Sequence, residues 1–136
     1  MSYNRRVVEE EDAASLKLGK DFQNVECLLI SEVKILLEAQ RDSKVKENKA
    51  LTAIHQKTLD YTKIFSRFTN QDSVREVRKL LSTSELSSFE ISQLGNMCCS
   101  EAVEAKSLIP SLIGKIDDES LEHLLKQIGS IKKFQT

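Results

Sequence analysis

Proline and glycine, the residues that most often break regular structure, are scarce in this sequence: its 136 residues include one proline and four glycines. Most apolar residues are spaced three or four positions apart rather than in alternation. Few chain breaks together with a helical period predict an all-α fold. Aromatic residues make up 5% of the chain and tryptophan is absent, so we expect a modest core.

Long apolar runs are also missing. The longest runs from Cys27 to Ile30, whereas a membrane-spanning helix needs about 20 residues. The first twelve residues are rich in charge and contain no apolar stretch, so we expect no secretory signal. Three cysteines, with Cys98 and Cys99 adjacent, make a poor disulfide framework, which is typical of a reducing compartment. We therefore expect an intracellular protein with no membrane segment, in either the cytosol or the nucleus.

Neither sign of charge dominates the chain. Twenty Lys and Arg residues stand against 21 Asp and Glu residues, for a formal net charge of −1. This balance argues against a protein whose main task is to bind phosphate backbones. The densest basic face of an expected helix holds Arg75, Arg78 and Lys79. Both a solvated surface and a weak RNA contact are consistent with these three residues.

The residue types that catalysis and metal binding require are few and scattered. His55 and His123 fall in different expected helices, and neither has a Cys or His at ligand spacing. Cys98 and Cys99 would point about 100° apart on a helix and cannot both reach one metal ion. The four glycines are isolated, so no phosphate-binding loop is present. We expect no catalytic site, no metal, no cofactor and no small-molecule substrate, and hence no enzyme.

Capping residues and apolar spacing predict six helices. The second covers about 48–66, and candidate N-caps mark the start of the others: Asn24, Asn70, Ser87, Ser100 and Asp117. Glu90, three residues after Ser87, completes a capping box. We expect the first helix to end near Gln40 and the sixth at Gly129, with the polar stretch 38–49 as a linker.

Two features predict how these helices pack. The second helix carries an apolar stripe that is typical of a core-facing surface, and His55 lies beside this stripe, where we expect it to be solvated. Gly95 in the fourth helix suggests either close packing or an early helix end. The residues of the stripe are Leu51, Ile54, Thr58, Tyr61, Phe65 and Phe68.

The N-terminal part of the chain has more apolar residues than one helix face needs. An exposed apolar patch of this kind marks a partner site, although packing of the first helix within the chain itself is the alternative. We therefore predict a partner-binding arm and first helix over 1–46 and a helical bundle over 47–136. The candidate interface residues are Val7, Val8, Leu16, Leu18 and Phe22 in the arm and Leu28, Leu29, Val33, Leu36 and Leu37 in the helix.

Four blocks of the sequence resemble one known family, the fourth subunit of eukaryotic RNA polymerase II. The similarity runs from about Glu9 to Thr136, and the ending Phe134-Gln135 also fits. Cys98-Cys99-Ser100 departs from the Cys-Pro pair that the family would lead us to expect. The blocks are Ser31-Glu32-Val33 with Leu36-Leu37-Glu38; Thr58 to Thr62 with Phe65 to Phe68; Leu86 with Phe89-Glu90, Leu94 and Asn96; and Glu104 to Leu112.

The resemblance implies a non-catalytic subunit of DNA-dependent RNA polymerase II. It implies a heterodimer with the seventh subunit, which forms a stalk that supports transcription initiation and lies near nascent RNA. The polymerase core and, indirectly, nascent RNA would then be further partners, in the nucleus and also in the cytoplasm. The C-terminal helices would adopt a fold like the helicase-and-RNase-D C-terminal (HRDC-like) fold. A stand-alone helical nucleic-acid-binding or adaptor module is the alternative.

A physical mechanism for the pairing follows from the arm and the first helix. The arm around Val7 and Val8 would add a strand to an exposed sheet edge of the partner, because main-chain hydrogen bonds tolerate charged neighbours. The resemblance implies a partner with two domains; the first helix would lie in the groove between them, and the C-terminal bundle would remain outside.

Overall fold

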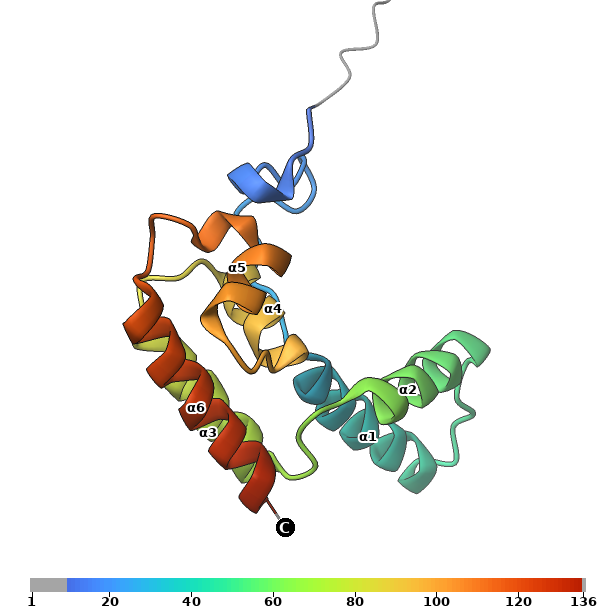
Figure 1. Cartoon of the computed structure of the whole chain (residues 1–136). Helices are drawn as coiled ribbons and strands as arrows, with labels where there is room; N and C mark the ends of the chain where they lie inside the picture. The colour runs from blue at the N-terminus through green and yellow to red at the C-terminus, as the bar shows by residue number, and fades with distance from the viewer. Residues whose placement is uncertain (1–9, 136) are drawn as a thin grey trace, which may run out of the picture.

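The all-α prediction is confirmed by the computed structural model, which describes residues 10–135; Val7 and Val8 lie outside this part (Figure 1). The described residues form no strand, only an isolated bridge between Asp12 and Lys17. The helices are α1 (Ile30–Lys46), α2 (Ala53–Phe65), α3 (Gln71–Ser82), α4 (Ser88–Met97), α5 (Ala102–Leu108) and α6 (Asp118–Phe134), with short 3-10 turns η1 (Ala13–Ser15) and η2 (Pro110–Leu112).

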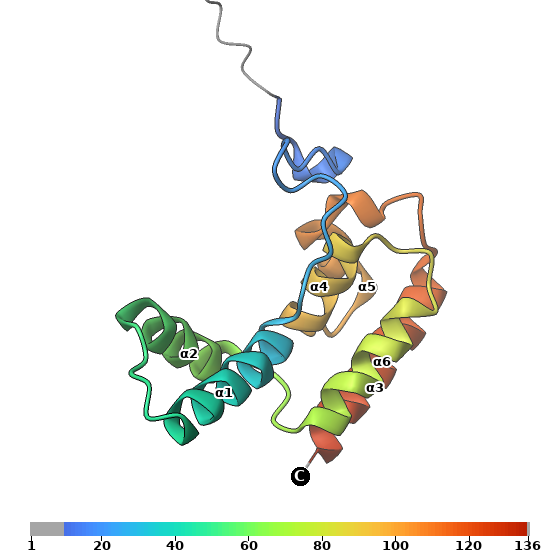
Figure 2. The ribbon, with the colours of Figure 1, turned by 180° about the vertical axis from the view of Figure 1, so that it is seen from behind.

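The molecule has two visibly different parts, joined by two stretches of chain. Helices α1 and α2 pack together as a helical hairpin that projects from a bundle of α3, α4, α5 and α6 (Figures 1 and 2). We call residues 25–29, which enter the hairpin, the entry segment, and residues 66–70, which leave it, the exit segment. The N-terminal stretch lies at the other end of the bundle, where η1 contacts η2. The expected boundary between 46 and 47 falls in the turn that joins α1 to α2.

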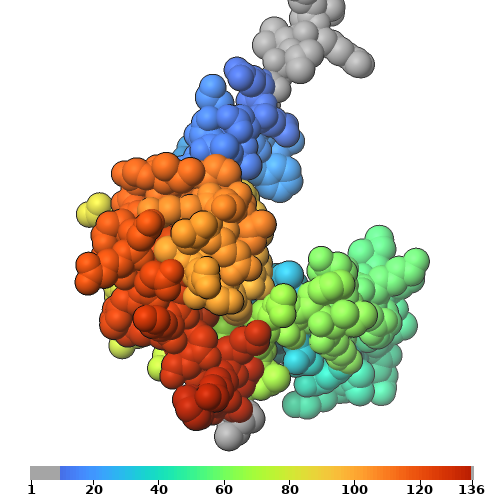
Figure 3. Space-filling view, in the orientation of Figure 1, coloured from blue at the N-terminus to red at the C-terminus, as the bar shows by residue number. Residues whose placement is uncertain are grey.

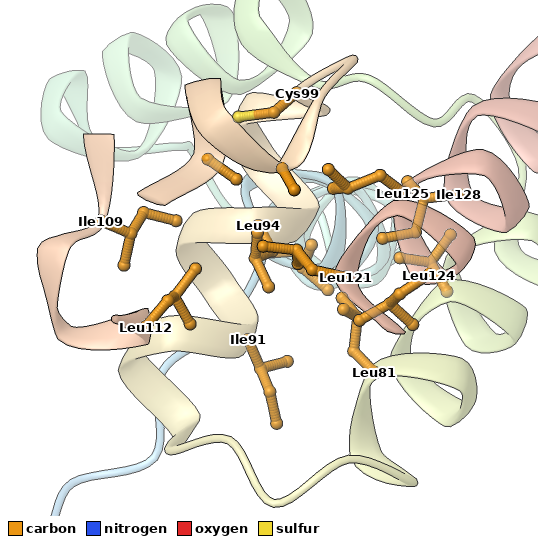
Figure 4. Packing of buried hydrophobic residues seen from close by; sticks show 14 of the residues in the cluster. Leu81, Ile91, Leu94, Cys99, Ile109, Leu112, Leu121, Leu124, Leu125 and Ile128 are labelled. Carbon is orange, nitrogen blue, oxygen red and sulfur yellow. The ribbon is translucent and has the colours of Figure 1, made fainter. Parts of the chain in front are cut away.

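The core lies inside the bundle, where α3 and α6 lie side by side (Figures 2 and 4). Leu81, Leu94 and Leu121 are completely buried there, and Ile128 is nearly so. Burial of such side chains is worth about 1.5 to 3 kcal/mol each, so the apolar faces of α3, α4 and α6 are the main source of stability. The largest buried side chains also include Phe68 of the exit segment and Leu29 of the entry segment.

Three of the five expected N-caps are confirmed, those at Asn70, Ser87 and Asp117. Ser100 is not the cap of α5, which begins after Glu101 without a side-chain cap, and α2 begins at Ala53 rather than near 48. The side chain of Asn70 accepts a hydrogen bond from the Ser73 amide at 2.8 Å, and Asp117 caps α6 in the same way. The capping box of Ser87 and Glu90 is also present, and the buried Glu90 carboxylate additionally pairs with Lys115. Helix α6 continues through Gly129 to Phe134, so the expected stop was wrong. Half-buried Ile131 still packs against the core, and this contact extends the helix.

The first helix differs from the expectation at both ends. Asn24 does not cap it but has a left-handed backbone (φ 61°), and the helix begins six residues later at Ile30. The reason is tertiary: the Cys27 amide donates to Ser88 Oγ at 2.7 Å and the Ile30 amide to Asn96 Oδ1 at 2.9 Å, which holds the entry segment along α4.

The expected linker at 38–49 is also wrong, because α1 extends to Lys46. This stretch consists mainly of good helix formers, and charge alone does not end a helix. Leu37, Arg41 and Lys44 recur at helical spacing and are half-buried. Packing against α2 therefore stabilises the polar half of α1.

Helix α2 buries a different face from the expected one. Ile54, Tyr61 and Phe65 of the apolar stripe are exposed, whereas His55, Leu59 and Thr62 are buried. Thus His55 is not solvated: its Nε2 atom lies 3.1 Å from the Leu37 carbonyl oxygen in α1. In a two-helix hairpin only one side of each helix is covered, so an apolar stripe can remain outside.

At Gly95 the entry segment packs directly against helix α4 of the bundle. A Cβ atom added at Gly95 would lie 1.9 Å from Leu29 Cδ2 and 3.5 Å from Leu81 Cδ1. Leu29 itself is 1% exposed, so it has little room to move away. Of the two alternatives for Gly95, close packing is confirmed.

The substitution Gly95→Ala should therefore lower the free energy of unfolding by about 1 to 3 kcal/mol, the usual effect of overpacking a core. Gly129→Ala is the matched control, because a Cβ there meets nothing within 4 Å. That change should raise the free energy of unfolding by roughly 0.5 to 1 kcal/mol through helix propensity. Denaturant unfolding measures both, and equal effects of the two changes would contradict the packing described.

Candidate partner-binding surface

Apolar side chains of the entry segment, the preceding turn and α1 are open to solvent. Phe22 is 68% exposed, Leu28 46% and Leu36 53%. Of the other expected interface residues, Leu16, Leu18, Val33 and Leu37 are half-buried, whereas Leu29 lies in the core of this chain. The structure thus leaves a set of apolar side chains available along the N-terminal half, with Leu29 facing inward.

Several clefts lie along the entry segment, and the walls of two of them are the most apolar. One of about 440 Å³ is lined by Leu18, Phe22, Val25 and Phe89, so it brings the arm together with the start of α4. The other, of about 190 Å³, lies between α1 and α3 and includes Leu28, Ile35, Leu36 and Val74. Clefts with mainly apolar walls suit the anchoring side chains of a protein partner.

The outer face of α2 adds apolar surface, only part of which, at Ile54, Tyr61 and Phe65, belongs to the stripe that we expect to face the core. Ile54 is 79% exposed and Ile64 73%. The rings of Tyr61 and Phe65 contact each other with centroids 4.6 Å apart and are about half exposed. The space-filling view shows the hairpin standing clear of the bundle (Figure 3). A signal for this was present in the sequence, since Leu59 with His55 and Thr62 defines a second face of α2.

The position of the entry segment depends on Arg78 in α3. The Arg78 guanidinium forms a two-pronged ion pair with the Glu32 carboxylate in α1, with Nε 3.2 Å from Oε2, and donates to the Cys27 carbonyl at 3.0 Å. Glu32 in turn accepts a hydrogen bond from the Leu29 amide at 2.8 Å. One guanidinium therefore fixes both the start of α1 and the chain before it.

This arrangement changes the interpretation of the basic face on α3. A weak RNA contact and a solvated surface are the two interpretations of Arg78 from sequence, but its guanidinium is engaged by Glu32 and Cys27. Arg75 and Lys79 are exposed, and the acidic Glu76 is exposed beside them. The face thus offers two cations rather than three.

The described residues contain no group of three or more His, Cys, Asp or Glu side chains that could hold a metal ion. Cys99 is buried and Cys98 is half-buried, and burial raises the pKa of both thiols. Protonated thiols are poor nucleophiles. In this part of the chain no helix is long and apolar enough to span a membrane.

The described residues form a small helical protein with exposed apolar side chains concentrated along its N-terminal half. Comparison with known proteins identifies the family of this chain. The RNA polymerase Rpb4 family matches residues 27–132, so the chain belongs to this family. It is 41% identical over 133 residues to DNA-directed RNA polymerase II subunit rpb4 of Schizosaccharomyces pombe, covering 96% of this chain and 98% of the relative. It is 38% identical to DNA-directed RNA polymerase II subunit 4 of Arabidopsis thaliana, over 93% of this chain and 97% of the relative.

The substitution Arg78→Ala should lower the free energy of unfolding by about 1 to 3 kcal/mol, because it leaves the partly buried Glu32 carboxylate unpaired. Arg75→Ala, one helical turn away on an exposed site, should change it by less than about 0.5 kcal/mol. Thermal and denaturant unfolding test this contrast. An Arg78→Ala chain as stable as the Arg75→Ala chain would show that the guanidinium does not hold the entry segment.

Proposed function

We propose that this chain is a non-catalytic subunit of RNA polymerase II that pairs with the seventh subunit. Together they would form a stalk that supports transcription initiation and lies near nascent RNA. Membership of the Rpb4 family and the names of its relatives support the assembly.

One observation carries the proposed pairing: the exposed apolar side chains are concentrated in one half of the chain. Among the described residues, nine of the thirteen large exposed hydrophobic side chains lie between Phe22 and Phe65, and four lie in the longer stretch after it. Scattered exposed apolar residues are ordinary, but a concentration beside clefts marks an interaction surface. The partner-binding surface is therefore assigned to the N-terminal half of the chain.

The proposed interface combines the arm with α1 and reaches the outer face of α2. Phe22, Leu28 and Leu36 supply exposed anchors, and the contacting rings of Tyr61 and Phe65, tilted by 40° to each other, supply more on the hairpin. Leu29 contributes only indirectly, because its side chain stabilises the bundle. Aromatic and large aliphatic anchors of this kind carry most of the energy of a protein interface.

Several further expectations belong to the same proposal. The heterodimer would bind the polymerase core and act in the nucleus, and also in the cytoplasm. Its contact with nascent RNA would be made largely by the partner, since this chain has a net charge of −1. The bundle of α3 to α6 would face outward as a surface for other factors, in an HRDC-like arrangement.

The interface is tested by Leu36→Asp. Burying an unpaired carboxylate at the contact should weaken binding to the seventh subunit by about 2 kcal/mol or more, roughly thirtyfold. The control is Val103→Asp in α5, where the residue replaced is 68% exposed and lies in the other half of the chain. Calorimetric titration of each variant with the purified seventh subunit gives the affinities. Unchanged affinity for Leu36→Asp, or an equal loss for Val103→Asp, would refute the assignment.

The peripheral role in RNA binding is tested by reversing the charge of Arg75 and Lys79 together in the heterodimer. Each cation that pairs with a phosphate adds about 0.7 to the slope of log affinity against log salt for single-stranded RNA, so the double reversal should reduce this slope by at most about 1.4. Lys126→Glu with Lys133→Glu on α6 controls for net charge. Complete loss of RNA binding by an intact heterodimer would instead place the RNA site on this chain.

A further inference from the structure

Gln135, directly after α6, holds the exit segment from outside the hairpin. Its Oε1 atom accepts a hydrogen bond from the Thr69 amide at 2.8 Å, and its Nε2 atom donates to the Arg67 carbonyl at 2.9 Å. One side-chain amide thus bonds to both neighbours of Phe68, in the pattern that a parallel strand would provide. The two hydrogen bonds join residues that are 66 and 68 positions apart in the sequence.

Phe68 between these two groups is fixed on its other sides as well. Its side chain is 2% exposed in the core, and its amide donates to Ser31 Oγ in α1 at 3.2 Å. The Arg67 side chain donates from Nε to the Asn96 carbonyl in α4 at 3.3 Å. The exit segment is therefore attached to the bundle through α4 and the end of α6, and to the hairpin through α1.

The entry segment has its own attachments through Ser88, Asn96 and Arg78. The entry and exit segments are the two connections between bundle and hairpin. When both are fixed, the hairpin has one orientation relative to the bundle, whereas a single fixed connection would act as a hinge. We infer that the side-chain amide of Gln135 fixes the orientation of the hairpin relative to the bundle and so acts as a positioning residue for partner binding.

This role rests on the proposed function, because the candidate surface is divided between the two parts. The cleft of Leu18, Phe22 and Phe89 lies against the bundle, while Leu36 and the aromatic pair of α2 lie on the hairpin. A partner that binds both parts gains affinity when their relative orientation is set in advance. Loosening the exit segment would lower that affinity without removing any side chain of the interface.

The experiment compares Gln135→Ala with Gln127→Ala, a glutamine on the exposed side of the same helix. In the full chain, residual dipolar couplings of backbone amides report whether the hairpin and the bundle share one alignment. We expect one alignment for the unmodified and Gln127→Ala chains and separate alignments for Gln135→Ala. Hydrogen exchange at the Thr69 amide should accelerate about tenfold, as expected when two hydrogen bonds are removed.

Affinity for the seventh subunit should fall about threefold to tenfold for Gln135→Ala and stay constant for Gln127→Ala. A shared alignment that persists in Gln135→Ala would overturn the inference, and so would an unchanged affinity with separate alignments. If the unmodified chain does not bind the seventh subunit, the proposed function fails, while the alignment still decides whether Gln135 orients the hairpin.

Discussion

The ion pair between Arg78 and Glu32 is the interaction on which the arrangement of this molecule depends. It connects α3 of the bundle to the first turn of α1, and the same two side chains also hold the backbone at Cys27 and Leu29. Because the pair is only partly exposed, solvent screens it less than an ordinary surface ion pair. This attachment fixes the entry segment, which is one of the two connections that together set the direction in which the hairpin leaves the bundle.

Local signals predicted the bundle well. The caps at Asn70, Ser87 and Asp117 are short-range hydrogen bonds, so their sequence patterns are sufficient to locate them. The start of α1 could not be found in this way, because Asn24 has a suitable side chain but the chain there is held by Ser88 and Asn96 from α4. Contacts across more than sixty residues leave no signal in the spacing of nearby residues.

The surface was harder to predict than the core for a related reason. Apolar periodicity shows that a helix has an apolar face, but not whether this chain or another covers it. In α2 the stripe of Ile54, Tyr61 and Phe65 has the spacing of a core face and lies outside. In α3, Arg78 was grouped correctly with Arg75 and Lys79 on one helix, yet only its distant partner Glu32 shows that it is structural.

The packing of Leu29 against Gly95 has a consequence for the order in which the protein acquires its structure. During synthesis, Leu29 leaves the ribosome well before the glycine against which it packs. The entry segment therefore remains without a core until α4 has been made, and its apolar residues stay open to association in that interval. Contacts this distant in sequence also slow folding, since a long loop must close first. A partner already present could shield these residues during that interval, which would make assembly and folding parts of one process.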